Sequence, residues 1–297
     1  MRSLLFILNF ILAQHLIVAQ KTAINGSIFS TKDSSFVSFA TIENMKKESG
    51  TVADENGKFA IDFDMVQIGD SLIIRALGFE DLSYIVDKDL SIRSDIICYL
   101  EPKVFNIEEV IIRPNSLSET KGTTRSNYNA SYHANAFNKV ALYIDNNNNR
   151  TGIIKSVSFF IHKEGKHRAP FRVRIYKVGS SGQPGEDLLT ETVLGKAKKK
   201  NSWVNINLEE FAIAIPEDGF FVCMEWIYTS DKYYYTKTLP RDLGTYKLYG
   251  ANLANVPVPP DEGRTWTTYL GKSWYKHTSS SKHAFNALIN AELNYNE

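Results

Sequence analysis

The chain has few cysteines, almost no net charge and no long apolar segment after its first 20 residues. Cys98 and Cys223 lie in separate apolar runs, which predicts two buried thiols rather than a disulfide framework. With 34 Lys and Arg against 33 Asp and Glu, the net charge is +1, so no overall field attracts nucleic acid or an anionic membrane. We therefore expect no nucleic-acid partner and no transmembrane helix in the mature chain.

Signatures of catalysis are also missing. The sequence has no Gly-x-Ser-x-Gly, no phosphate-binding loop and no dinucleotide fingerprint. Adjacent carboxylates such as Glu209 and Glu210 would point to opposite sides of a strand, which does not suit a glycosidase acid and base. No His-Glu-x-x-His pattern includes any of His133, His162, His167, His277 and His283. The sequence thus predicts a protein that is not an enzyme, with no catalytic residue, no metal site and no cofactor.

The N-terminus is typical of a secretory signal peptide. Met1 and Arg2 precede an apolar run over residues 4–18, and Ala19 and Gln20 follow it. We expect cleavage near Ala19, a signal peptide over residues 1–20 and an exported protein of the periplasm or cell surface.

Residues 50–59 have the pattern Gly-Thr-x-x-Asp-x-x-Gly-x-Phe, which predicts a β-hairpin. Gly57 can adopt a positive φ in the turn, and Asp54 can bond back to the backbone. After the turn, Phe59 and Ile61 alternate with polar positions, as in a strand with one buried face. A further apolar run over residues 70–79 ends in Leu-Gly-Phe, where Gly78 predicts a bulge or a close backbone contact.

Together with the apolar runs at 24–28 and 37–42, these motifs resemble the carboxypeptidase-D regulatory-like domain over about residues 22–101. The resemblance implies a small prealbumin-like or Ig-like β-sandwich, the non-catalytic appendage of metallocarboxypeptidases, without their zinc ligands. The same module often precedes the plug of TonB-dependent outer-membrane receptors, and residues 101–112 look like the segment that follows it there. The rest of this 297-residue chain is far too short for such a receptor, so we do not expect a transporter.

The second half reads as another all-β unit. Polar residues over 102–135 predict a linker. Short apolar segments then predict strands at 140–144, 153–162, 171–178, 188–194, 203–208, 220–228 and 284–293. Their order is similar to that of jelly-roll domains of bacterial surface and glycan-handling proteins. We therefore expect a carboxypeptidase-regulatory-like sandwich over 21–101 and a larger jelly-roll-like sandwich over 136–297.

Aromatic residues concentrate between positions 226 and 275. Trp226 shares a strand face with apolar neighbours and is expected in the core, whereas three consecutive tyrosines cannot all point inward. Exposed Tyr and Trp rings stack on sugars or on partner side chains, and nearby arginines can fix orientation. The predicted ligand-binding residues are Tyr233, Tyr234, Tyr235, Trp266, Trp274, Arg241 and Arg264.

Two polar segments allow more than one interpretation. Residues 145–149 place oxygen ligands at alternate positions, as a calcium loop would, but they lack the glycine and closing Glu and also fit a polar hairpin tip. The lysine-rich tip at 196–200 could contact phosphate or an acidic glycan, or could be a solvated hairpin that prevents sheet aggregation.

The sequence thus favours an exported, non-catalytic protein of the Gram-negative cell envelope. Its C-terminal sandwich would bind a partner, either a glycan or an envelope protein, through aromatic residues. One alternative is a structural or docking partner of an outer-membrane complex. Another is a hydrolase or carboxypeptidase-related enzyme whose site is not recognisable from sequence.

Overall fold

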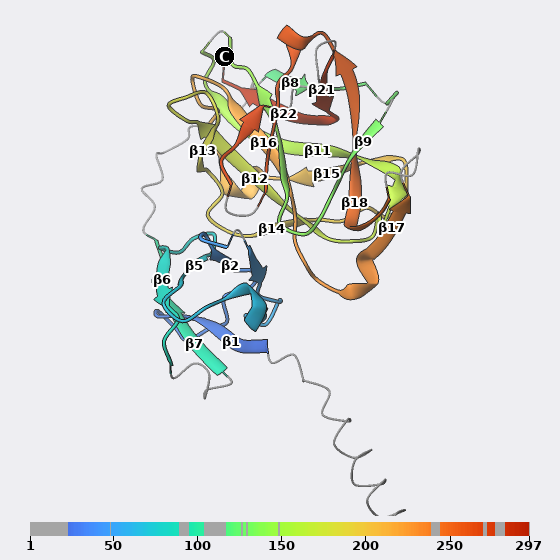
Figure 1. Ribbon diagram of the computed structural model, residues 1–297. Coiled ribbons are helices and arrows are strands. Elements are labelled where there is room, and N and C mark those ends of the chain that lie inside the picture. The colour runs from blue at the N-terminus through green and yellow to red at the C-terminus, as the bar shows by residue number, and fades with distance from the viewer. Residues whose placement is uncertain are drawn as a thin grey trace, which may run out of the picture.

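The computed structural model describes residues 23–47, 49–88, 95–103, 117–125, 127–128, 130–147, 149–238, 244–269, 272–276 and 283–296. The described chain is all-β, as predicted, and its strands form a smaller and a larger sandwich (Figure 1). The expected signal peptide over 1–20 lies outside the described residues. None of the helices in the described part of the chain is long and apolar enough to cross a membrane.

The smaller sandwich is built from residues 23–103. One sheet has the order β4 (Lys58–Asp62), β1 (Ala23–Ser30) and β7 (Asp95–Leu100), and β1 and β7 run parallel. The other sheet has the order β3 (Ser49–Val52), β2 (Thr41–Asn44), β5 (Ser71–Arg75) and β6 (Leu82–Ile85). A 3-10 helix, η2 (Phe63–Met65), follows β4. Buried residues of both sheets, among them Ile28, Ile61 and Ile74, share one core.

The predicted turn is confirmed between β3 and β4, but the predicted β-hairpin is wrong, because β3 pairs with β2 and β4 pairs with β1 in the other sheet, so that the turn links the two sheets. Asp54 Oδ1 accepts hydrogen bonds from the backbone N–H of Asn56, at 2.8 Å, and of Lys58, at 2.9 Å. Gly57 has a φ of +67°, the left-handed conformation expected of a glycine at this point.

The larger sandwich is built from residues 117–296. Its first sheet has the order β13 (Pro184–Asp187), β12 (Phe171–Val178), β16 (Phe220–Trp226), β10 (Lys139–Ile144), β19 (Thr265–Thr268) and β20 (Tyr275–Lys276), with β14 (Val193–Gly195) also on β12. Its second sheet has the order β17 (Tyr234–Thr238), β18 (Thr245–Val258), β11 (Gly152–Gly165), β22 (Ile289–Tyr295) and β8 (Leu117–Gly122). Three more strands join that sheet: β15 (Ser202–Asn207), β21 (Ala284–Ala287) and β9 (Ala130–Ala134).

The core of the larger sandwich lies between these two sheets. Phe171, Val173 and Ile175 alternate along β12 and point into it, and Trp226 is 1% exposed there, as predicted. Short 3-10 turns link strands at η4 (Glu209–Phe211), η5 (Asp231–Tyr233) and η6 (Pro260–Glu262). Cys98 and Cys223 are buried free thiols, one in each sandwich, which confirms the prediction that they do not form a disulfide.

The expected linker over 102–135 is corrected by two strands within it. β8 pairs with β22, and β9 pairs with β18, so the second sandwich begins no later than Leu117. β8 is a largely polar edge strand that its backbone pairing with β22 holds in place, and it therefore lacks the alternation that sequence patterns detect. The strand expected over 188–194 is wrong for residues 188–192, since β13 ends at Asp187 and β14 begins only at Val193.

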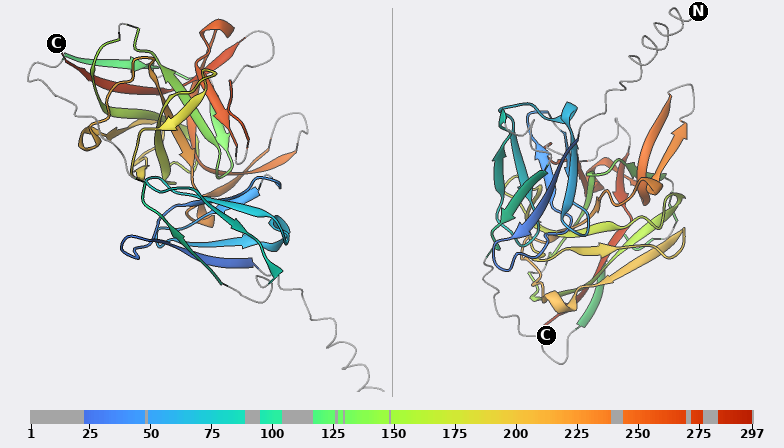
Figure 2. Two further views of the ribbon diagram at one scale, coloured as in Figure 1. Left: turned by 90° about the vertical axis from the view of Figure 1, so that its left-hand side faces the viewer. Right: turned by 90° about the horizontal axis from the view of Figure 1, so that it is seen from below.

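The two sandwiches contact each other through the turn that follows β5. Leu77 packs against the core of the larger sandwich, although it belongs to the smaller one. Gly78 has a φ of +83°, and a Cβ atom built there would lie 2.5 Å from the carbonyl oxygen of Thr190. Gly78 thus makes the close backbone contact that the sequence predicted, and its partner, Thr190, belongs to the other sandwich. Figure 2 shows the sandwiches side by side in two further views.

Candidate functional site

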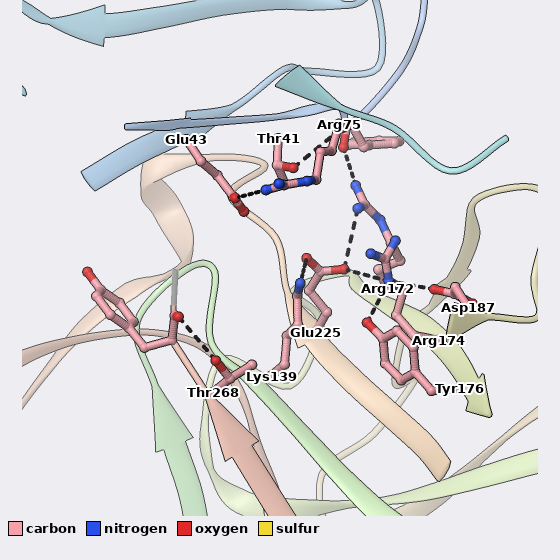
Figure 3. Close-up of polar contacts among 12 residues, drawn as sticks. Thr41, Glu43, Arg75, Lys139, Arg172, Arg174, Tyr176, Asp187, Glu225 and Thr268 are labelled. Carbon is pink, nitrogen blue, oxygen red and sulfur yellow. Dashed lines mark hydrogen bonds and ion pairs between the residues drawn. The ribbon is translucent and has the colours of Figure 1, made fainter. Parts of the chain in front are cut away.

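One candidate site is the charged cluster on the outer face of the first large sheet, where the smaller sandwich covers it (Figure 3). The strand register creates a row of polar side chains, because Arg172 pairs with Glu225, Glu225 with Lys139, and Lys139 with Thr268. The next outward positions on these strands are Arg174, Cys223, Ala141 and Trp266. Alternation along β12 therefore sends Phe171, Val173 and Ile175 inward, and Arg172, Arg174 and Tyr176 outward.

Glu225 is the centre of this cluster. Its carboxylate lies 3.3 Å from Arg172 Nη1, 3.5 Å from Arg174 Nε and 3.7 Å from Lys139 Nζ. Burial acts to raise the pKa of Glu225, but the positive charges of Arg172, Lys139 and Arg174 outweigh it and lower the pKa to about 2. Glu225 is therefore a fixed anion that holds three cations together.

Asp187 and Phe39 complete the cluster. Arg174 Nε lies 2.9 Å from Asp187 Oδ2, and burial raises the pKa of Asp187 against the opposing charge of Arg174. Arg172 Nη2 donates a hydrogen bond to the backbone carbonyl of Phe39 in the smaller sandwich, so this buried arginine bridges the two sandwiches. The cluster has the character of a structural ion network.

A second candidate site is a cavity of about 720 Å³ in the larger sandwich. Three segments that are distant in sequence meet around it: the turn between β11 and β12, the β14–β15 loop, and η5 with the start of β17. We call this space the basic tyrosine cavity, and its lining residues are Gly165, Lys166, His167, Arg168, Lys196, Lys200, Lys232, Tyr233 and Tyr235. None of these lining residues is acidic, although the whole chain has a net charge of only +1.

Backbone contacts hold the segments of the cavity in place. Lys166 N–H donates to the Gly250 carbonyl at 2.8 Å, which ties the β11–β12 turn to β18. The Tyr235 hydroxyl donates to Asn252 Oδ1 at 2.5 Å, so Tyr235 is anchored to the same strand. Burial lowers the pKa of His167, and the positive charges of Arg168 and Lys200 lower it further. The cations of two separate loops therefore act on one another across the cavity.

Tyrosine rings continue beyond the cavity along β17 and β18. Lys232 Nζ lies 5.1 Å from the centroid of the Tyr233 ring, and Lys247 Nζ lies 4.0 Å from that of the Tyr234 ring. Tyr234 and Tyr249 pack edge to face, with 5.0 Å between their centroids. All three tyrosines of the 233–235 triplet are half-buried.

The other predicted ligand-binding residues lie elsewhere. Trp266 packs against Phe221, and Trp274 packs against Tyr176, on the outer face of the first large sheet. Arg264 points to Asp145, with 3.9 Å between Nη1 and Oδ2. Arg241 lies outside the described residues. The structure thus brings two of the predicted residues, Tyr233 and Tyr235, into one cavity and separates them from the two tryptophans.

The segment considered as a calcium loop is built into a turn. Asp145 forms an ion pair with Lys121 at 3.1 Å, and the Asn146 side chain donates to the carbonyls of Arg150 and Pro216. These contacts fit a polar turn rather than a calcium loop, but the turn is not a hairpin tip, because β10 and β11 belong to different sheets. No group of three or more His, Cys, Asp or Glu side chains that could hold a metal ion occurs among the residues that the structure describes.

Sequence reasoning noticed the tyrosine triplet and the lysine tip separately, but not that they meet. It also missed Lys166, His167 and Arg168 as part of a site, as well as the whole Glu225 cluster. A signal for that cluster existed in the alternation Phe-Arg-Val-Arg-Ile-Tyr over 171–176, where arginines interrupt an otherwise apolar strand. Arginines at alternate positions of a strand that is buried on both faces need buried partners.

Comparison with known proteins gives no family. Neither a family model nor a curated protein matches the chain. Among solved structures, the fimbrial protein FimP from Actonomyces oris aligns with 93% of this chain and 84% of its own, at 8% identity and a TM-score of 0.21. A structure of infectious bursal disease virus, Gt strain, aligns with 92% of this chain and 64% of its own, at 11% identity and a TM-score of 0.23. Likenesses this weak carry no argument about the function of the chain.

Proposed function

We propose that this protein is a non-catalytic binding protein whose ligand is an acidic polysaccharide, held in the basic tyrosine cavity. The observation that supports this most is the convergence of six basic side chains and two tyrosines from three segments on one cavity that has no acidic lining residue. Tyrosine rings offer flat faces to sugar rings, and the lysines and arginine neutralise carboxylate or sulfate groups.

The cations that line the cavity are exposed to solvent, and they form no ion pairs with described residues of the protein. Lys166, Arg168, Lys196, Lys200 and Lys232 are all exposed. No ion pair within the described residues uses any of these five cations, in contrast to Arg172 and Arg174 in the Glu225 cluster. Their charge is therefore available to a ligand.

Export and a cell-envelope location belong to the same proposal. They rest on the signal-peptide pattern of residues 1–20 and on the resemblance of residues 22–101 to the carboxypeptidase-D regulatory-like domain. In this view the smaller sandwich is the accessory module and the larger one carries the binding site.

Affinity electrophoresis of the full chain tests the proposal. Gels would contain polygalacturonate, an acidic polymer, or dextran, a neutral one. We expect retardation only by polygalacturonate, because the cavity has cations and no carboxylates. The double variant Lys196→Ala, Lys200→Ala should lose most of this retardation, and so should Tyr233→Ala.

The matched control removes an exposed lysine elsewhere. Lys58→Ala, on β4 of the smaller sandwich, changes the net charge without touching the cavity. Retardation by polygalacturonate that is equal in wild type and in the double lysine variant would refute the proposed site.

A further inference from the structure

A second binding site is suggested by the cleft between the two sandwiches. It has a volume of about 440 Å³, and residues of both sandwiches line it. Arg75 and Leu77 come from the smaller sandwich, and Arg174, Lys139 and Trp274 come from the larger one. The Glu225 cluster forms part of its wall, and Figure 3 shows the polar contacts of these residues.

The charges that line this cleft do not cancel. Six cations, Arg75, Lys103, Lys139, Arg172, Arg174 and Lys272, line it together with five carboxylates, Glu43, Asp81, Glu186, Asp187 and Glu225, so one positive charge is left over. The side chains of Arg172 and Glu225 are each 2% exposed, and that of Arg174 is 16% exposed. A net positive lining with a largely buried arginine in it favours an anion in the cleft.

Arg174 offers the group that would take the anion. Its hydrogen bond to the Tyr176 hydroxyl, at 3.0 Å, and its closest approaches to Asp187 and Glu225 all involve Nε. No described residue accepts a hydrogen bond from Nη1 or Nη2 of Arg174. Nε is thus fixed by the protein, while the terminal nitrogens remain for a ligand. An arginine held in this way presents two parallel N–H donors, which match the two oxygens of a carboxylate.

The remaining lining favours an apolar body attached to that carboxylate. Trp274, Leu189 and Phe79 line the same cleft. A dianion such as phosphate fits less well, because it would carry two charges toward Glu225 and Asp187 when only one positive charge is in excess.

The geometry points to a binding site for a small monocarboxylic acid, with its carboxylate on the terminal nitrogens of Arg174 and its apolar part against Trp274. This site is separate from the basic tyrosine cavity, with which it shares no lining residue.

Titration of the full chain with hexanoate, followed by tryptophan fluorescence and calorimetry, tests this site. We expect a saturable response to hexanoate and an affinity at least ten-fold weaker for hexanamide, its neutral analogue, and for inorganic phosphate. Arg174→Lys keeps the positive charge beside Glu225 but removes the two parallel N–H donors of the guanidinium group. This variant should therefore bind hexanoate at least ten-fold more weakly.

Two controls separate this site from other effects. Lys200→Ala alters only the basic tyrosine cavity and should bind hexanoate as wild type does, whatever happens to polysaccharide binding. Trp274→Phe should abolish most of the fluorescence response while calorimetry still detects hexanoate, and it serves as the informative variant if Arg174→Lys does not fold. Equal affinities for hexanoate and hexanamide, or a response retained in full by Trp274→Phe, would overturn the inference.

Discussion

The Glu225 cluster and the basic tyrosine cavity both concentrate positive charge, but they use it in opposite ways. In the cluster, Arg172 is almost fully buried and Arg174 is largely buried, and both lie at ion-pair distance from Glu225 or Asp187. In the cavity, cations such as Lys200 and Arg168 are exposed and have no such partner. Paired, buried charge holds a structure together, whereas unpaired, exposed charge is free to bind a ligand. The cluster should therefore govern stability, and the cavity should govern affinity for an anionic polymer.

The largest expected effect is the loss of stability when Glu225 is removed. Glu225→Ala would leave Arg172, Arg174 and Lys139 without their shared partner in a buried setting, which costs about 3–5 kcal/mol. Thermal or urea unfolding followed by circular dichroism measures this change. Lys200→Ala is the comparison from the cavity and should shift stability by no more than about 0.5 kcal/mol. If Glu225→Ala and Lys200→Ala lowered the free energy of unfolding by the same amount, the cluster would be no more important for stability than the cavity, which would contradict this comparison.

Acid should weaken the cluster through the same residue. The folded-state pKa of Glu225 is about 2, below its ordinary value of 4.5, so its stabilising contribution is complete above pH 4.5 and disappears as the pH falls toward 2. Unfolding midpoints of wild type and Glu225→Gln, measured between pH 5 and 2, isolate this contribution. Wild type should lose more stability than the variant across that window, and parallel profiles would show that Glu225 is not a buried anion.

Much of the fold could be predicted from sequence, because alternation and turn chemistry are local. The turn at Asp54 and Gly57, and strands such as β12 and β16, follow from patterns of a few residues, whereas the pairing of β3 with β2 and of β4 with β1 does not. β18 was not predicted, since Gly250, Asn252 and Pro257 interrupt its apolar pattern, although most of the strand is buried. Its stability comes from pairing with β11, β17, β9 and β21, which no local pattern reveals.

The candidate site was less predictable, because it depends on which loops meet. Tyr233 and Tyr235 were predicted as binding residues only because aromatic side chains in this region were expected to be exposed. The same argument applied to Trp266, so it could not show that Trp266 lies at a different place in the fold. The structure separates them through register, since Trp266 pairs with Ala141 on a face already packed against Phe221. Lys166 and Lys200 lie on different loops, and only the fold of β11, β12 and β18 brings them together.

The most direct test of the central claim is the salt dependence of polygalacturonate binding by the wild-type full chain. If the unpaired cations of the basic tyrosine cavity supply the affinity, binding should weaken by at least ten-fold between about 50 and 200 mM salt, because screening weakens exposed charges most. The melting temperature should change little over the same range, since the Glu225 cluster is shielded from salt. Binding that is indifferent to salt would contradict the account.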